Sequence, residues 1–265
     1  MLIIGERINS TRPAIRKAIE DRNASLILKE AAAQIRSGAG FIDVNCAVTS
    51  GDEVQDMDWL MSVLQNGIAD VNICIDSPNY LAIDKALGVY NAKGTLMVNS
   101  ITGESSRLDR IVPLAAKHNT KLIALTMTEQ GMPATAQDRL DIARRILEQV
   151  KGRGFDAENL YFDPLIRPIS TEPEQAREFL KAIPLIKDLG VKTICGLSNV
   201  SFGLPNRRLI NSTFLTMAIQ SGLDAAILDP TDKEMLSAIK TSGMLLGLDD
   251  FCADYIKAFR EGQLV

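Results

Sequence analysis

Residues 72–77 read Asn-Ile-Cys-Ile-Asp-Ser, a short apolar run that ends in an acid and a hydroxyl. Nearly continuous apolar runs of this kind are typical of strands covered on both faces, as in a parallel sheet. Similar runs recur along the chain, separated by longer stretches with helical periodicity. The pattern predicts eight strands, at residues 2–9, 41–45, 72–77, 94–100, 121–127, 160–165, 192–199 and 224–230.

The spacing of these strands predicts the fold class. Their starts advance in steps of about 32 residues, which is enough for one strand, one helix and two loops. Eight alternating β/α units in 265 residues are typical of a single (β/α)8 TIM barrel of the α/β class. We therefore expect one barrel domain over residues 1–265. A doubly wound sheet is the alternative, although it seldom contains eight evenly spaced units.

Amphipathic segments lie between the predicted strands. Apolar residues recur at helical spacing, which predicts helices that include residues 52–68, 138–150, 174–189 and 209–221. Gly190 and Gly222 follow two of these segments and are predicted to end them. Thr171, followed by a proline and acids, is a candidate N-cap for the third.

Composition excludes several classes of protein. Hydrophobic residues make up 46% of the chain and charged residues 23%, which is sufficient for a large core. The net charge of −4 argues against nucleic acid as the main partner, because phosphate binding needs a basic surplus. No apolar run approaches the roughly 20 residues that cross a bilayer. The N-terminus does not resemble a secretion signal, so we expect a cytoplasmic protein without a membrane partner.

Cysteine and histidine usage limits the chemistry. The four cysteines form no Cys-x-x-Cys pair, and His118 is the single histidine. A zinc site needs several close Cys or His ligands, and a Ser-His-Asp triad needs a well-placed histidine. We therefore expect no tightly bound metal. Carboxylates, amides, hydroxyls or a bound cofactor must carry any reaction.

Polar residues stand at the ends of the predicted strands. Seven of the eight strands end in Asp or Asn, and in a barrel these ends meet on one rim. Each residue alone also suits a turn or a helix cap, but together they predict a polar cup. Carboxylates and carboxamides suit a flat heterocycle with adjacent N–H donors and acceptors, such as a pterin, guanine or another purine. The residues are Asn9, Asp43, Asn45, Asp76, Asn99, Asp163, Asn199 and Asp229.

Several strings in the chain carry a family resemblance. The most specific is Gly-Leu-Ser-Asn-Val-Ser at 196–201, followed by Asn-Arg-Arg-Leu-Ile-Asn at 206–211. Others are Gly-Glu-Arg-Ile-Asn at 5–9, Ile-Asp-Ser at 75–77, Val-Asn-Ser at 98–100 and Asp-Pro-Leu at 163–165. The sequence resembles the methyltetrahydrofolate:corrinoid protein methyltransferases. That pterin-binding barrel family also includes dihydropteroate synthase and the folate domain of cobalamin-dependent methionine synthase.

The resemblance implies a substrate and a set of site residues. By it, Asp76, Asn99 and Asp163 hold the pterin ring, and Asn199 is the catalytic amide near N5. The substrates would be methyltetrahydrofolate or tetrahydrofolate and the cobalt of a corrinoid (cobalamin) carried by a separate protein. Members of this family are typically homodimers.

Other residues of the cup have more than one possible role. Asp43 and Ser198 are candidates to hold a water that supplies a proton to N5. Glu6 could bind the folate or form a salt bridge with Arg7 across the barrel mouth, and the salt bridge is the preferred prediction. Arg207 could move on binding, contact the corrinoid protein, or simply begin a solvated helix.

Two other functions stay open from the sequence. One is a pterin condensation of the dihydropteroate synthase type, although the loops that would handle phosphate and aminobenzoate have no clear match. The other is a non-catalytic folate-binding partner of a corrinoid protein. The direction of methyl transfer, from folate to cobalt or the reverse, also stays open.

Overall fold

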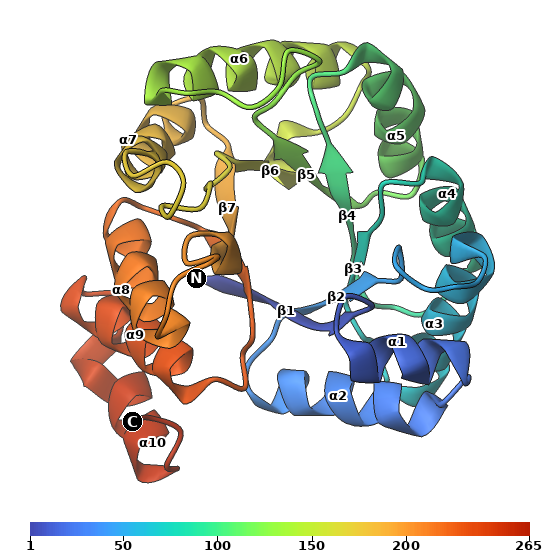
Figure 1. Ribbon diagram of the computed structural model, residues 1–265, viewed down its shortest axis with the longest axis horizontal. Helices are drawn as coiled ribbons and strands as arrows, with labels where there is room; N and C mark the ends of the chain where they lie inside the picture. Colours follow the sequence, from blue (N-terminus) through green and yellow to red (C-terminus); the bar gives the residue numbers. More distant parts are fainter.

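The computed structural model describes residues 1–265 and contains a closed barrel of eight parallel strands (Figure 1). The strands follow one another in sequence order, and β8 pairs with β1 to close the ring. The predicted (β/α)8 TIM barrel is confirmed. The strands are β1 (Leu2–Asn9), β2 (Phe41–Asn45), β3 (Ile73–Asp76), β4 (Leu96–Ile101), β5 (Lys121–Leu125), β6 (Leu160–Asp163), β7 (Lys192–Gly196) and β8 (Ala225–Leu228).

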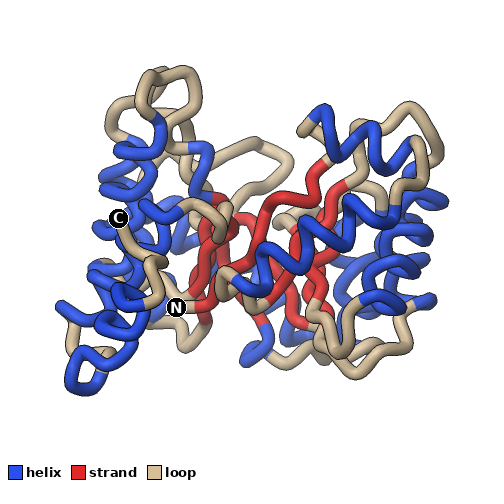
Figure 2. Tube along the Cα trace, turned by 90° about the horizontal axis from the view of Figure 1, so that it is seen from below, coloured by secondary structure: helices blue, strands red, loops and turns tan.

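Helices surround the barrel on all sides, and Figure 2 shows them flanking the central strands. None of them has the length and hydropathy needed to cross a membrane. The helices are α1 (Pro13–Glu20), α2 (Ala24–Arg36), α3 (Glu53–Gly67), α4 (Tyr80–Val89), α5 (Ser105–Lys117), α6 (Ala136–Gly152), α7 (Gln175–Lys187), α8 (Arg207–Gln220), α9 (Lys233–Leu245) and α10 (Ala253–Arg260).

Most predicted boundaries agree with the structure to within two residues, but the predicted strand at 192–199 is too long. β7 ends at Gly196, and residues Leu197–Asn199 form a 3-10 helix, η2. Leu197 is 1% exposed and packs in the cluster beneath this turn. Because the chain turns to bury Leu197, Asn199 lies beyond the strand instead of at its end.

Predicted helix ends are confirmed at the glycines and wrong at Thr171. Gly190 and Gly222 have φ values of 77° and 99°, the left-handed conformation that ends a helix. The third predicted helix begins at Gln175. The Thr171 hydroxyl instead donates to the carbonyl of Pro168, at 3.0 Å, and therefore belongs to the preceding turn.

The inside of the barrel changes from apolar to polar along the strands. A buried apolar cluster fills the lower part, and it comprises Ile4, Phe41, Cys74, Met97, Ile123, Tyr161, Ile194 and Ala225. Side chains two positions apart on a strand point to the same face. The residues two positions later on five of these strands are Glu6, Asp43, Asp76, Asn99 and Asp163. The predicted polar cup thus rests on an apolar base.

The packing of α7 on α8 gives a stability prediction. Phe179 is fully buried, and its ring centroid lies 5.5 Å from that of Phe214. Phe179→Ala should lower the free energy of unfolding by about 3–5 kcal/mol, because it removes a large buried side chain and leaves a cavity. Denaturant unfolding measures this, and a loss below about 1 kcal/mol would contradict the packing described.

Candidate functional site

Two carboxyl groups lie side by side on β2 and β3. Asn45 donates its side-chain amide to Asp76, at 3.0 Å. Asp43 is 2% exposed, and its Oδ1 has no hydrogen-bond partner. Burial, followed by the charge of Asp76, raises the pKa of Asp43 well above its ordinary value. The two groups therefore hold one negative charge more readily than two.

Asp163 ends β6 and contacts the start of the β7–α8 connection. Its carboxylate accepts from the backbone N–H of Leu165, at 2.7 Å, and of Gly196, at 3.3 Å. Burial raises the pKa of Asp163 to about 6, although both amides and Arg139 act in the opposite direction. Asp163 is thus largely anionic at neutral pH. The contact with Gly196 places it next to the turn that carries Asn199.

Asn199 lies in η2 and is exposed. Its side-chain amide makes no hydrogen bond with the rest of the protein, whereas its backbone carbonyl accepts from Phe202. The next helix, α8, begins at Arg207 with Asn206 as its N-cap. Asn199 therefore caps no helix, and its amide is free to contact a ligand.

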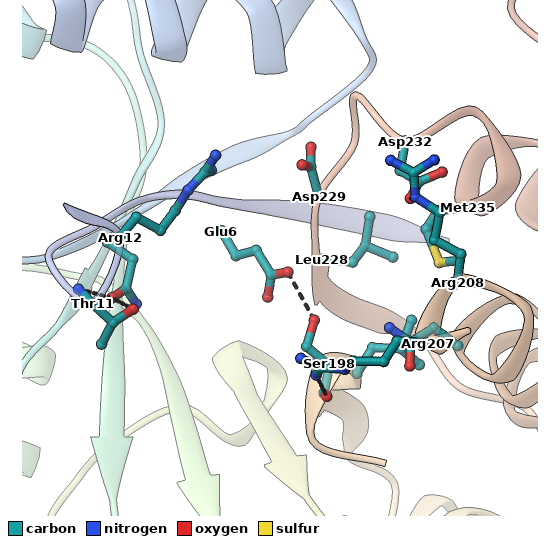
Figure 3. A pocket seen from close by; sticks show the side chains of 13 residues that line it. Glu6, Thr11, Arg12, Ser198, Arg207, Arg208, Leu228, Asp229, Asp232 and Met235 are labelled. Carbon is teal, nitrogen blue, oxygen red and sulfur yellow. Dashed lines mark hydrogen bonds and ion pairs between the residues drawn. The ribbon is translucent and has the colours of Figure 1, made fainter. Parts of the chain in front are cut away.

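A cavity of about 490 Å³ opens at the rim, and Figure 3 shows the side chains that line it. Ser198 donates its hydroxyl to Glu6, at 2.9 Å, and Arg207 and Asp229 also line the cavity. Burial is the main reason that the pKa of Glu6 is raised. Three of the predicted site residues line the cavity, namely Glu6, Ser198 and Arg207. The other five, Asp43, Asp76, Asn99, Asp163 and Asn199, lie outside it.

The predicted salt bridge between Glu6 and Arg7 is wrong. Neighbouring residues of a strand point to opposite faces, so Glu6 enters the barrel and Arg7 turns away from it. The Arg7 guanidinium binds Glu30, at 2.6 Å, and Asp229, at 2.7 Å. Arg7 therefore joins α2 to the segment after β8. The Glu6 carboxylate instead faces the polar cup.

Arg207 makes more contacts than expected for a residue that only begins a solvated helix. Its side chain is exposed, yet it donates to the Ser201 hydroxyl, at 2.9 Å, and to the Ser198 carbonyl. Both acceptors belong to the turn around Asn199. Arg207 thus fixes the turn that presents the free amide.

Two arginines behind the cup were not among the predicted site residues. Arg107, on α5, donates to the Ser100 carbonyl, and Arg139, on α6, donates to the Pro164 carbonyl, both at 2.6 Å. Arg139 is fully buried. The sequence did carry a signal for it, because Arg139 lies on the same helix face as the buried Ala136 and Ala143.

Metal ligands and reactive thiols are not found at the rim. No group of three or more His, Cys, Asp or Glu side chains is placed to hold a metal ion. Cys74 and Cys195 are fully buried within strands, and burial raises the pKa of both thiols well above its ordinary value. The polar groups that face the rim are carboxylates, amides, hydroxyls and the guanidinium groups of Arg12, Arg207 and Arg208.

Comparisons with known proteins agree with this geometry. The family described as pterin binding enzyme matches residues 5–229. Methylcorrinoid:tetrahydrofolate methyltransferase of Eubacterium limosum is 34% identical over 269 residues, covering all of this chain and 98% of that protein. Methionine synthase of Mycobacterium tuberculosis is 32% identical over 242 residues, which are 86% of this chain but only 20% of that much longer protein.

Solved structures show the same fold. Dihydropteroate synthase of Yersinia pestis with a pterin-sulfa conjugate superposes with a TM-score of 0.69, covering 93% of this chain and 94% of that one. Its sequence identity is 16%, so this likeness establishes the shared barrel and nothing finer. The family match and the full-length relative show that the chain belongs to the pterin binding enzymes.

Proposed function

We propose that this protein is a methyltransferase that moves a methyl group between N5 of tetrahydrofolate and the cobalt of a corrinoid carried by a separate protein. The observation that carries the proposal is the unpaired Asn199 amide, which lies in the turn directly after Gly196, the residue whose backbone N–H donates to the buried Asp163 carboxylate. The name of the full-length Eubacterium limosum relative supports the same pair of substrates. The corrinoid is a substrate here, and so is the folate.

In this proposal the pterin ring lies over the apolar base of the cup. The 2-amino group and N3–H of the ring would donate hydrogen bonds to the side-chain oxygens of Asp76, Asn99 and Asp163. A buried carboxylate is costly without donors, and pterin N–H groups would supply them. Asp43 also has an unpartnered oxygen that a ligand or a water could satisfy.

Methyl transfer at N5 requires a change of charge on the nitrogen. An amine is a poor leaving group unless N5 becomes positive, so a proton must reach N5 by the transition state. Asn199 is no acid at ordinary pH, but its amide oxygen can accept from the protonated N5–H and stabilise that charge. The proton would come from solvent, through a water held by Asp43 or Ser198.

A single-turnover assay tests this function. The purified protein is mixed with tetrahydrofolate and methylcobalamin, and the cobalt spectrum is followed; we expect demethylation of the cobalt and formation of methyltetrahydrofolate. The reverse reaction is measured with reduced cobalamin and methyltetrahydrofolate. Folate binding without transfer in either direction would indicate a non-catalytic partner. Release of pyrophosphate from dihydropterin pyrophosphate and aminobenzoate would indicate condensation instead.

A further inference from the structure

Arg107 joins the two segments that follow Asp76 and Asn99. Its guanidinium donates to three backbone carbonyls, those of Ser100 at 2.6 Å, Pro78 at 2.8 Å and Ser77 at 3.0 Å. Ser77 and Pro78 come directly after Asp76, and Ser100 comes directly after Asn99. One side chain therefore fixes the ends of β3 and β4 relative to each other.

Arg139 holds the segment that follows Asp163 in a similar way. It is fully buried and donates to the carbonyls of Pro164, at 2.6 Å, and Leu165, at 3.1 Å. It also donates to the side chain of Gln175, at 2.7 Å, at the start of α7. The loop that follows Asp163 is thus held from behind by a buried cation.

Neither arginine forms a salt bridge, although Arg139 is fully buried and Arg107 is half-buried. The guanidinium groups of Arg107 and Arg139 donate to uncharged oxygens, and both lose solvation. Burial raises the pKa of Asp76 and of Asp163, and the positive charge of Arg107 and of Arg139 respectively acts against that rise. Asp43 has no such cation among the groups that shift its pKa.

We propose that Arg107 and Arg139 are positioning residues of the pterin site, which hold the ends of three strands and favour the anionic form of Asp76 and Asp163 without contacting the ligand. A direct ion pair would occupy the carboxylate oxygens. Because the arginines bind backbone carbonyls, those carboxylate oxygens, which already accept from Asn45, Leu165 and Gly196, keep further lone pairs for ligand N–H groups, while the field of the cation still favours the charged form. The identity of the ligand rests on the proposed function, but the charge of Asp76 does not.

The titration of Asp76 tests the proposal without any ligand. The charged and titratable groups near it are Asp43 on β2, Glu53 on α3, Arg107 on α5 and the thiols of Cys46 and Cys74. Carbon-13 NMR of the aspartate carboxyl groups, assigned with Asp76→Asn, reports the pKa directly. Arg107→Met should raise the pKa of Asp76 by about one unit, because a nearby opposite charge is lost.

Three variants separate charge from structure. Arg107→Lys keeps the charge and should leave the Asp76 titration within about 0.3 units of wild type, even where folate affinity falls. Arg153→Met is the matched control, since Arg153 also bridges separate elements, from the end of α6 to α5, but does so through Asp109 on the surface; it should change neither property. Thermal unfolding checks that each variant is folded. Because Arg139 is fully buried, results for Arg139→Lys are interpreted only if that variant folds. The Arg107 variants decide the outcome of the test.

Folate binding gives the second readout. In Arg107→Met the acid limb of the affinity–pH profile should move to higher pH together with the Asp76 titration. A loss of affinity that is equal at every pH, with an unchanged Asp76 titration, would overturn the proposal and leave Arg107 a purely structural residue. If wild-type protein binds no folate, the proposed function fails, and the carboxyl titration still decides the role of the arginine.

Discussion

We expect Asn199→Ala to slow methyl transfer by about 100-fold or more while folate affinity changes less than about tenfold. The Asn199 amide has no partner in the protein, and in the proposed reaction it stabilises only the charge that forms on N5. Interactions made only in the transition state affect the rate and not the affinity. Asp76, Asn99 and Asp163 would still hold the ring in the variant.

Single-turnover rates and folate titrations measure the two effects separately. Asn91→Ala is a suitable control, because Asn91 is also an exposed asparagine but follows α4, at the opposite end of the barrel. The pH profile of the rate should also change in Asn199→Ala, since protonated N5 loses its acceptor. A near wild-type rate with weakened folate binding would make Asn199 a binding residue and contradict the mechanism.

The barrel could be predicted from the sequence because its signals are local and repeated. Each strand is a short apolar run, and each is followed by a helix with one apolar face, so an error at one boundary does not affect the others. The polar cup was also predictable, since parallel strands bring their ends to one rim. Side-chain alternation then places Asp43 and Asp76 inside the barrel with Phe41 and Cys74.

Features that depend on contacts between distant segments could not be predicted. Glu6 and Arg7 are adjacent in sequence, yet their partners lie on η2 and on α2, 192 and 23 residues away. Arg107 and Arg139 are bound by loops that follow other strands, and no spacing rule connects an arginine to such carbonyls. The turn after β7 depends on the burial of Leu197, which is decided by packing and not by local propensity.

Asp163 should show a conflict between stability and binding. Burial raises its pKa from 3.8 to about 6, so the folded protein binds this proton more tightly than the unfolded chain does. Protonation of Asp163 should therefore raise the free energy of unfolding as pH falls from about 6 to about 4. At pH 7 the Asp163 anion lowers the free energy of unfolding. Asp163→Asn removes the charge but also replaces one of the two oxygens that accept from Leu165 and Gly196, so it should stabilise the ligand-free protein at pH 7 by no more than about 1–2 kcal/mol.

The same substitution should weaken folate binding by roughly 10- to 150-fold at pH 7, because hydrogen bonds to a charged acceptor contribute about 1.5–3 kcal/mol. Wild-type affinity should also fall as pH drops below about 6, where Asp163 takes up its proton, and the variant should lose that part of the pH dependence. Denaturant unfolding without ligand and folate titrations from pH 5 to about 8 measure both effects. A variant that is less stable at pH 7, yet binds folate as tightly as wild type, would show that the Asp163 anion serves the fold and not the ligand.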